Sequence, residues 1–140
     1  MPQELSYFRL SFLSFLRDSH PNLATDTNLI AARGDAAAEA YSSSIKNGQS
    51  HDHADELASE VLYRGLLFSP YRTIVRILWD EFEKEVTPVL AEGAAVGLLP
   101  KLTDVFSQYD LSDNFEATEE YNQLYTELTG AIQILLEDGI

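Results

Sequence analysis

The stretch SHDHADELASE, residues 50–60, holds the residue types in this chain most able to do chemistry. It contains two of the chain's three histidines, His51 and His53, among four acids. Imidazole and carboxylate groups together can hold a metal ion or transfer protons. The same residues also suit a helix start, with Asp52 as the N-cap and Asp55 in the first turn, where an acid favours the helix dipole. We predict that residues 50–60 form the start of a helix rather than a metal site or a proton-transfer site.

Metal-binding motifs do not match the spacing of these histidines. His51 and Asp55 can meet across one helical turn, but His53 then points elsewhere. No glutamate stands three residues before any histidine, as a ferritin-like site requires, and no His-Glu-x-x-His motif is present. We therefore expect no metal and no cofactor. A metal-dependent enzyme is kept as an alternative, and it would be centred on His51, His53, Asp55 and Glu56.

Other catalytic and binding templates also fail. The sequence has no Gly-rich phosphate loop and no Gly-x-Ser-x-Gly motif. A calcium loop beginning at Asp110 would need glycine where Phe115 stands and a bidentate glutamate where Tyr121 stands. Residues 107–118 are better explained as a loop followed by a helix entry. We predict that the protein is not an enzyme.

Length and composition indicate one globular domain over residues 1–140. Apolar residues make up 45% of the chain and there are no cysteines, which fits a reducing compartment. The N-terminal segment lacks the features of a secretory signal, and no apolar run approaches the length of a membrane span. We expect a cytoplasmic protein with no membrane contact.

Acidic residues are unevenly distributed along the chain. The net charge is −14, and residues 102–140 contain nine acids and no Lys or Arg. A polyphosphate backbone repels such a chain, so we predict no direct nucleic-acid binding. The acidic segment allows a second alternative, a DNA mimic that inhibits a DNA-binding protein.

Apolar residues recur at helical spacing throughout, and no run alternates as a strand does. We predict an all-α fold, a compact bundle of about six helices. The first ends at His20, the second covers about 26–46, and the third begins near Asp52. The fourth runs through Val86 after a Ser69-Pro70 start, the fifth is bent or split before Pro100, and the last follows Thr118. Gly34 and residues 36–38 form a small-residue face that would admit another helix closely.

The first helix has more apolar residues than one buried face needs. Leu5, Phe8, Phe12, Phe15 and Leu16 share a face, whereas Tyr7, Leu10 and Leu13 fall outside it. A helix that is apolar nearly all round is central or contacts a partner. We therefore predict Tyr7, Leu10 and Leu13 as an interface with a second copy or another protein.

Trp79 lies at the edge of the apolar face of the fourth helix. Arg72 and Arg76 lie nearby on that helix, and Arg76 can pair with Asp80 one turn later. Trp and Arg dominate interface hot spots, so Trp79, Arg72 and Arg76 are candidate interface residues. The simpler alternative is a half-buried tryptophan flanked by a guanidinium group.

Glu81 and Glu85 stand one helical turn apart on the other edge of that face. We expect them to be partly buried and paired with Arg64 or Arg9. Two such carboxylates can do acid–base work, but pairs like this are common on ordinary helices.

Four stretches of the chain resemble a small family of Bacteroidetes proteins of unknown function. They are SYFRLSFLSFLRDSHP near the start, RGDAAAEAY at 33–41, LYRGLLFSPYRTIVRILWDEF at 62–82, and VFSQYDLSDNFEATEEYNQLYTELTGAIQILLE at 105–137. The similarity spans nearly the whole chain, and LYTELTG at 124–130 is its most specific part. The resemblance implies an all-helical domain and supplies no catalytic residues. Members often lie on conjugative or other mobile elements, which favours an accessory role. We expect a non-enzymatic helical protein-interaction module that binds a protein partner or forms a homodimer.

Overall fold

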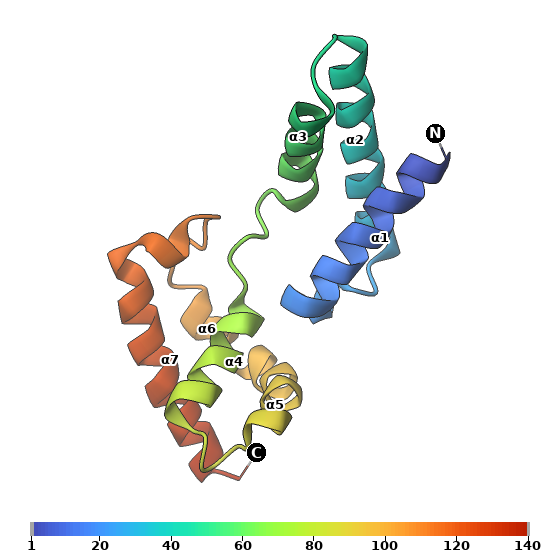
Figure 1. Ribbon diagram of the computed structural model, residues 1–140. Coiled ribbons are helices and arrows are strands. Elements are labelled where there is room, and N and C mark those ends of the chain that lie inside the picture. The colour runs from blue at the N-terminus through green and yellow to red at the C-terminus, as the bar shows by residue number, and fades with distance from the viewer. Residues whose placement is uncertain (1, 140) are drawn as a thin grey trace. The chain divides into compact units, whose positions relative to one another are not determined.

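Helices are the only regular elements in residues 2–139, the part of the backbone that the computed structural model describes. Side chains are described from residue 7 onward, so Leu5 lies outside them. The α-helices are α1 (Pro2–Ser19), α2 (Thr27–Lys46), α3 (His51–Tyr63), α4 (Pro70–Glu81), α5 (Ala91–Leu98), α6 (Thr103–Phe106) and α7 (Glu119–Glu137) (Figure 1). Short 3₁₀ turns are η1 (Pro21–Leu23), η2 (Pro88–Leu90), η3 (Leu99–Leu102) and η4 (Phe115–Ala117). The predicted all-α class is confirmed.

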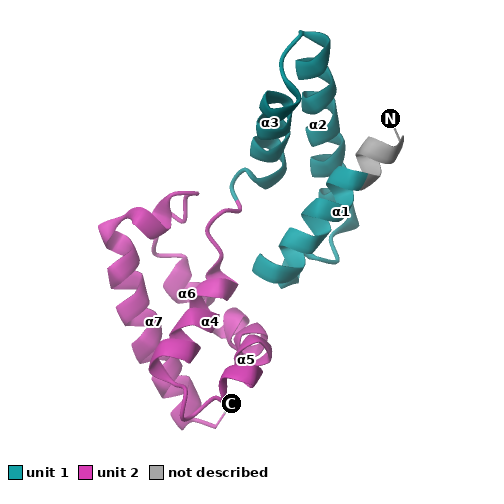
Figure 2. Ribbon diagram, in the orientation of Figure 1, with its two compact units in different colours: residues 1–65 teal, residues 66–140 magenta. Residues whose placement is uncertain are grey.

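The chain divides into two compact units, residues 1–65 and 66–140 (Figure 2). Unit 1 contains α1 to α3, and unit 2 contains α4 to α7. Each unit has buried apolar residues of its own. The single domain expected from the length of the chain stays a prediction.

In unit 1, α2 packs against both α1 and α3. The buried apolar side chains of the unit are Phe8, Phe12, Leu16, Ala37, Ala38, Ala54, Ala58 and Leu62. Ile45 follows Gly34 by eleven residues, about three helical turns, which predicts that it lies on the same, buried face of α2. That prediction is wrong, because Ile45 is exposed and the neighbouring Ser44 is buried in its place.

Arg33 of α2 links the three helices of unit 1. Its guanidinium group donates a hydrogen bond of 2.9 Å to the carbonyl of Leu62 and a longer one of 3.5 Å to that of Val61, at the end of α3. The same group lies 5.9 Å from the ring centroid of Phe12 on α1. A cation at a helix C-terminus binds carbonyls that have no partner within the helix. Arg33 therefore stabilises the end of α3 and holds α1 and α3 to α2.

Most predicted helix starts are confirmed. The carboxylate of Asp26 accepts a hydrogen bond of 3.1 Å from the backbone of Leu29 and caps α2. Ser69 caps α4 by accepting from the backbone of Arg72 at 2.9 Å, and Pro70 follows at the first helical position. Proline, which lacks an N–H, fits the first helical position because an N–H there would have no partner within the helix.

The end of α4 differs from the prediction, whereas the end of α5 agrees with it. The fourth helix ends at Glu81 rather than near Val86, because the backbone of Phe82 leaves the helical conformation. The split expected before Pro100 is confirmed, since α5 ends at Leu98 and a 3₁₀ turn leads into α6. Proline lacks the N–H that a continued helix would need.

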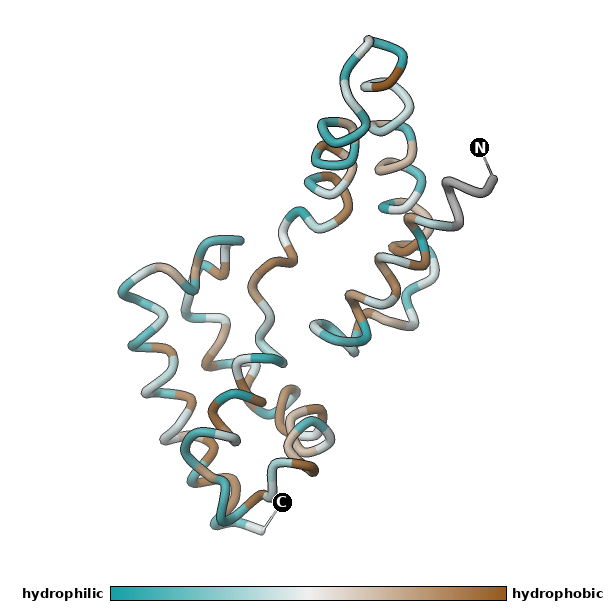
Figure 3. The backbone as a smooth tube through the Cα atoms, viewed as in Figure 1, coloured by the Kyte–Doolittle hydropathy of each residue, from teal (hydrophilic) through white to brown (hydrophobic). Residues whose placement is uncertain are grey.

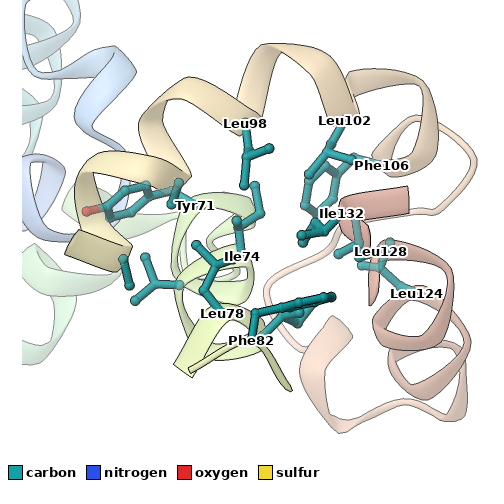
Figure 4. Close-up of a cluster of buried hydrophobic side chains, with 14 of the residues drawn as sticks. Tyr71, Ile74, Leu78, Phe82, Leu98, Leu102, Phe106, Leu124, Leu128 and Ile132 are labelled. Atoms are coloured by element: carbon teal, nitrogen blue, oxygen red, sulfur yellow. The ribbon is translucent and has the colours of Figure 1, made fainter. Parts of the chain in front are cut away.

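The core of unit 2 is built from α4, α5, α6, η4 and α7 around one cluster of buried side chains (Figure 4). Ile74, Leu78 and Phe82 come from α4 and the residue that follows it, and Leu124, Leu128 and Ile132 come from α7. Leu98, Leu102 and Phe106 close the cluster from α5 to α6. Apolar residues recur among polar ones along these helices, as amphipathic packing requires (Figure 3).

Candidate functional site

The histidine-rich stretch forms the first turns of α3. The N-cap is Ser50, whose side chain accepts a hydrogen bond of 3.1 Å from the backbone of His53. The prediction of Asp52 as the N-cap is therefore wrong. Asp52 lies in the first turn, where it can still interact with the helix dipole. Serine caps as well as aspartate does, and the chain uses the serine two residues earlier.

His51 and His53 are not brought together by this helix start. His51 Nδ1 is hydrogen-bonded to the hydroxyl of Tyr41 on α2, and the two rings meet edge-on at 5.3 Å. His53, Asp55 and the other acids of the stretch are exposed. Within residues 7–139, no group of three or more His, Cys, Asp or Glu residues is placed to hold a metal ion. The contact with Tyr41 gives His51 a role in packing α3 against α2.

The loop before α7 forms a turn and a helix entry. The hydroxyl of Ser112 donates to the side-chain oxygen of Asn114 at 2.8 Å. The carboxylate of Asp113 accepts from the backbone of Leu67 at 3.1 Å. These polar side chains thus order the loop and tie it to the start of unit 2.

Arg76 has a different partner from the one its spacing predicts. Its guanidinium group donates to the carboxylate of Glu116 at 2.9 Å and to the hydroxyl of Tyr121 at 3.0 Å. The expected partner, Asp80, instead accepts from the hydroxyl of Tyr125 at 3.5 Å. Packing of α4 beside α7 brings these oxygens within reach, and spacing along one helix cannot reveal it. Arg76 therefore holds α4 to the entry of α7, and its role as an interface residue stays a prediction.

Trp79 is flanked by Arg72 rather than by Arg76. The guanidinium carbon of Arg72 lies 5.7 Å from the Trp79 ring centroid, and the indole N–H donates to the carbonyl of Pro88 at 3.2 Å. Arg72 also contacts the carboxylate of Glu92 at 3.4 Å. The tryptophan is 40% exposed rather than half-buried, and the guanidinium group that we expected beside it belongs to Arg72. The indole hydrogen bond anchors the segment that leads into α5.

Beside this anchor, the segment from η2 to α5 exposes large apolar side chains. Val89 is 87% exposed, Leu90 is 62% exposed, and Val96 is 51% exposed. We call Trp79, Val89, Leu90 and Val96 the apolar set of unit 2. Ala91, Ala95 and Leu98 form the buried side of α5, whereas Val96 lies on its exposed side. Val89 and Leu90 follow Pro88, the residue that Trp79 contacts, and neighbouring exposed apolar side chains are typical of interaction surfaces.

Sequence reasoning found Trp79 in this set and missed Val89, Leu90 and Val96. A usable signal was present in the chain. Between Glu85 and Lys101 the only charged residue is Glu92, although the chain carries −14 overall. An uncharged segment in such an acidic protein can meet another surface without the cost of burying charge.

The candidate residues of the first helix are exposed to different degrees. Tyr7 is 60% exposed and Leu10 is 66% exposed, whereas Leu13 is half-buried. Arg9 lies between these residues in the sequence. Its guanidinium group donates hydrogen bonds of 2.8–3.0 Å to both carboxylate oxygens of Asp35 on α2. Tyr7 and Leu10 therefore form a second exposed apolar set, in unit 1.

Glu81 and Glu85 do not have the surroundings that we predicted. Both carboxylates are exposed rather than partly buried. The guanidinium group of Arg9, one of the two expected partners, binds Asp35. The prediction is wrong because α4 ends at Glu81, so Glu85 is not on the helix at all.

The acids of segment 102–140 stand in groups that are separated by wide gaps. On α7, Glu120 and Glu127 are separated by seven residues, or about 10 Å of helix. Duplex DNA carries one charge per roughly 1.7 Å of axis. Glu127 is also hydrogen-bonded to the hydroxyl of Tyr109, and Glu116 is paired with Arg76. The acids of this segment are too widely spaced to resemble the charges of duplex DNA, which gives the DNA-mimic alternative little support.

Comparison with known proteins finds a matching family model and a similar solved structure. Residues 1–139 match the model of a family described as a domain of unknown function, DUF1896. The chain is also similar to the crystal structure of protein PG0816 from Porphyromonas gingivalis, with 45% sequence identity and a TM-score of 0.93. That match covers 98% of this chain and 93% of the other. No curated protein matches the chain.

Proposed function

Because the chain belongs to the DUF1896 family, a domain of unknown function, we propose its role from its own surface: a non-enzymatic helical module that binds another protein. The observation that carries this proposal is the apolar set of unit 2. Burying exposed Val, Leu and Trp side chains is favourable by roughly 25 cal/mol per Å² of apolar surface removed from water. Trp79, with Arg72 beside it, has the composition of a binding hot spot.

The proposal that the module is not an enzyme is supported by what the sequence lacks. It contains no phosphate-binding loop, no nucleophile elbow and no metal-protease motif.

No described helix is long and apolar enough to cross a membrane. An accessory role on a mobile element is the finer proposal, and it rests on the family resemblance alone.

A photo-crosslinking experiment in the native host tests the proposal. A photoreactive amino acid is placed at Val89 in one variant and at Thr126 in a control variant. Thr126 is also exposed and lies in the same unit, on α7. We expect a discrete crosslinked protein from position 89 and none from position 126. The same products from both positions, or none from either, would contradict the proposal.

Sedimentation of the purified protein decides between a homodimer and a different partner. A second copy as partner predicts dimers that dissociate on Val89→Asp, if the unit 2 set is used, or on Leu10→Asp, if the unit 1 set is used. A clean monomer for the wild type over a wide concentration range would exclude the homodimer. The crosslinked product would then have to be another protein.

A further inference from the structure

A hollow with an apolar floor and an acidic rim opens in unit 2, where α4 and α7 end. Its volume is about 540 Å³. The lining residues are Glu81, Phe82, Glu85, Gln133, Leu136 and Glu137, and we call this the acidic hollow. Phe82 is buried and Leu136 is half-buried, whereas the three glutamates are exposed. The ends of the two helices lie at the same end of the unit (Figure 1).

Both helices direct the negative ends of their dipoles to this place. The last carbonyls of a helix lack partners within it and carry about half a negative charge together. Neither α4 nor α7 has a basic residue in its last turn. Instead, α4 ends on Glu81, and α7 ends on Glu137 with Asp138 as its C-cap. An acid at a helix C-terminus is unfavourable, so the hollow keeps a negative charge at some cost in stability.

Tyr125, which projects from α7, responds to the same charges. Burial, together with the negative charges of Glu81 and Asp80, raises the pKa of Tyr125 to about 12. The end of α4 thus imposes a negative potential on the neighbouring helix. Lys84, the base nearest in sequence to the hollow, is exposed and does not line it.

The shape of the hollow favours a long cation over a metal ion. No three of the described acids and histidines are placed to hold one ion, so the carboxylates do not converge on a point. Arginine and lysine side chains have an apolar stem and a charged head, and they bury the stem while the head stays among polar groups. An apolar floor beneath an acidic rim complements that form.

We propose that the acidic hollow binds an arginine or lysine side chain from a basic segment of a partner protein. The stem lies along Phe82 and Leu136, and the head lies among the carboxylates of Glu81, Glu85 and Glu137. This surface is distinct from the apolar set of unit 2. The two proposals can therefore fail separately.

Titration with synthetic peptides tests the proposal. The probes are two capped hexapeptides of equal charge, one alternating Arg with Leu and one alternating Arg with Ser. The hollow variant is Glu81→Gln with Glu137→Gln, and the control variant is Glu119→Gln with Glu120→Gln. Both variants change the net charge by the same amount, and the control acids are exposed at the opposite end of α7. Calorimetry gives each dissociation constant, and circular dichroism checks the helices.

We expect the hollow variant to weaken binding of the Arg-Leu peptide by about fivefold to tenfold, because two partly exposed charge pairs are lost. The control variant should weaken it by less than about twofold. The Arg-Leu peptide should also bind more tightly than the Arg-Ser peptide to the wild type. Equal weakening in both variants would show only a general attraction to an acidic protein and would overturn the proposal.

A single substitution outside α4 and α7 shows whether weaker binding could result from a loss of folding. Glu85→Gln leaves the ends of α4 and α7 unchanged and should weaken binding of the Arg-Leu peptide relative to a Glu83→Gln control, whose side chain does not line the hollow. No difference between these two variants would also overturn the proposal. None of these changes alters Val89, so crosslinking at that position tests the proposed function independently.

Discussion

Gly34 of α2 lies against the backbone of Arg9 on α1. A Cβ atom at position 34 would stand 2.5 Å from Cγ of Arg9, 3.1 Å from its backbone nitrogen and 3.2 Å from its Cα. The adjacent Asp35 binds the guanidinium group of the same arginine at 2.8 Å. A glycine and a bidentate ion pair thus fix α1 on α2, which is the close approach that the small-residue face predicted.

We expect Gly34→Ala to lower the free energy of unfolding, by up to about 2 kcal/mol. Overpacking costs about 1–3 kcal/mol, and the better helix propensity of alanine returns roughly 1 kcal/mol. Gly130→Ala is the matched control, because it lies in α7 with nothing within 4 Å of the added Cβ. That change should raise stability by about 1 kcal/mol. Urea denaturation measures both, and a stabilised Gly34→Ala protein would refute the close approach.

Ser50→Ala should cost about 0.5–2 kcal/mol of stability, because the backbone N–H of His53 loses its acceptor. Asp52→Ala should cost less, about 0.3–1 kcal/mol, since only an interaction with the helix dipole is lost. Thermal melting of the two variants ranks them. A larger loss for Asp52→Ala would show that α3 begins at the aspartate after all.

Replacing the histidines of α3 separates packing from metal binding. His53→Ala should change stability by less than about 0.5 kcal/mol, because the side chain is exposed. His51→Ala should cost more, about 0.5–1.5 kcal/mol, since the hydrogen bond with Tyr41 is lost. Both values should be the same with and without a chelator. Losses that vanish in the presence of the chelator would instead reveal a metal site.

Arg33→Met should destabilise the protein by about 1.5–3 kcal/mol. The change keeps an apolar stem but removes the charged donor from the carbonyl of Leu62. Arg17→Met is a suitable control, because Arg17 is exposed on α1. Chemical denaturation of the two variants measures the difference. Equal stabilities would show that Arg33 does not cap α3 in solution.

Stability should fall at high pH partly through Tyr125, whose pKa is raised from its ordinary value of 10.0 to about 12 by burial and by Glu81 and Asp80. In the unfolded chain this phenol ionises near pH 10. Its contribution to stability is therefore complete below pH 10 and is lost as the pH rises towards 12. Tyr125→Phe should flatten that part of the curve, and ultraviolet titration of both proteins locates the ionisation. A phenolate signal from Tyr125 near pH 10 would contradict the raised pKa.

The sequence by itself determined the elements, because helix formation depends on groups a few residues apart. Ser69 followed by Pro70 predicts the start of α4, and Pro100 predicts the break after α5, from hydrogen-bonding and steric rules that act within one turn. The stripe Leu124, Leu128 and Ile132 identifies the buried side of α7 by its period alone. The stop of α4 at Glu81 was missed, since no proline or glycine marks it.

Only the tertiary structure decided which side chains meet and which remain outside. Arg76 binds Glu116, 40 residues away, and Arg72 rather than Arg76 covers Trp79. Exposure of Val89 depends on how α5 rests against α4, and no local rule contains that packing. The acidic hollow likewise exists only because α4 and α7 end side by side. Periodicity is a property of one helix, whereas an ion pair, an exposed apolar side chain or a hollow is a property of two helices that have packed together.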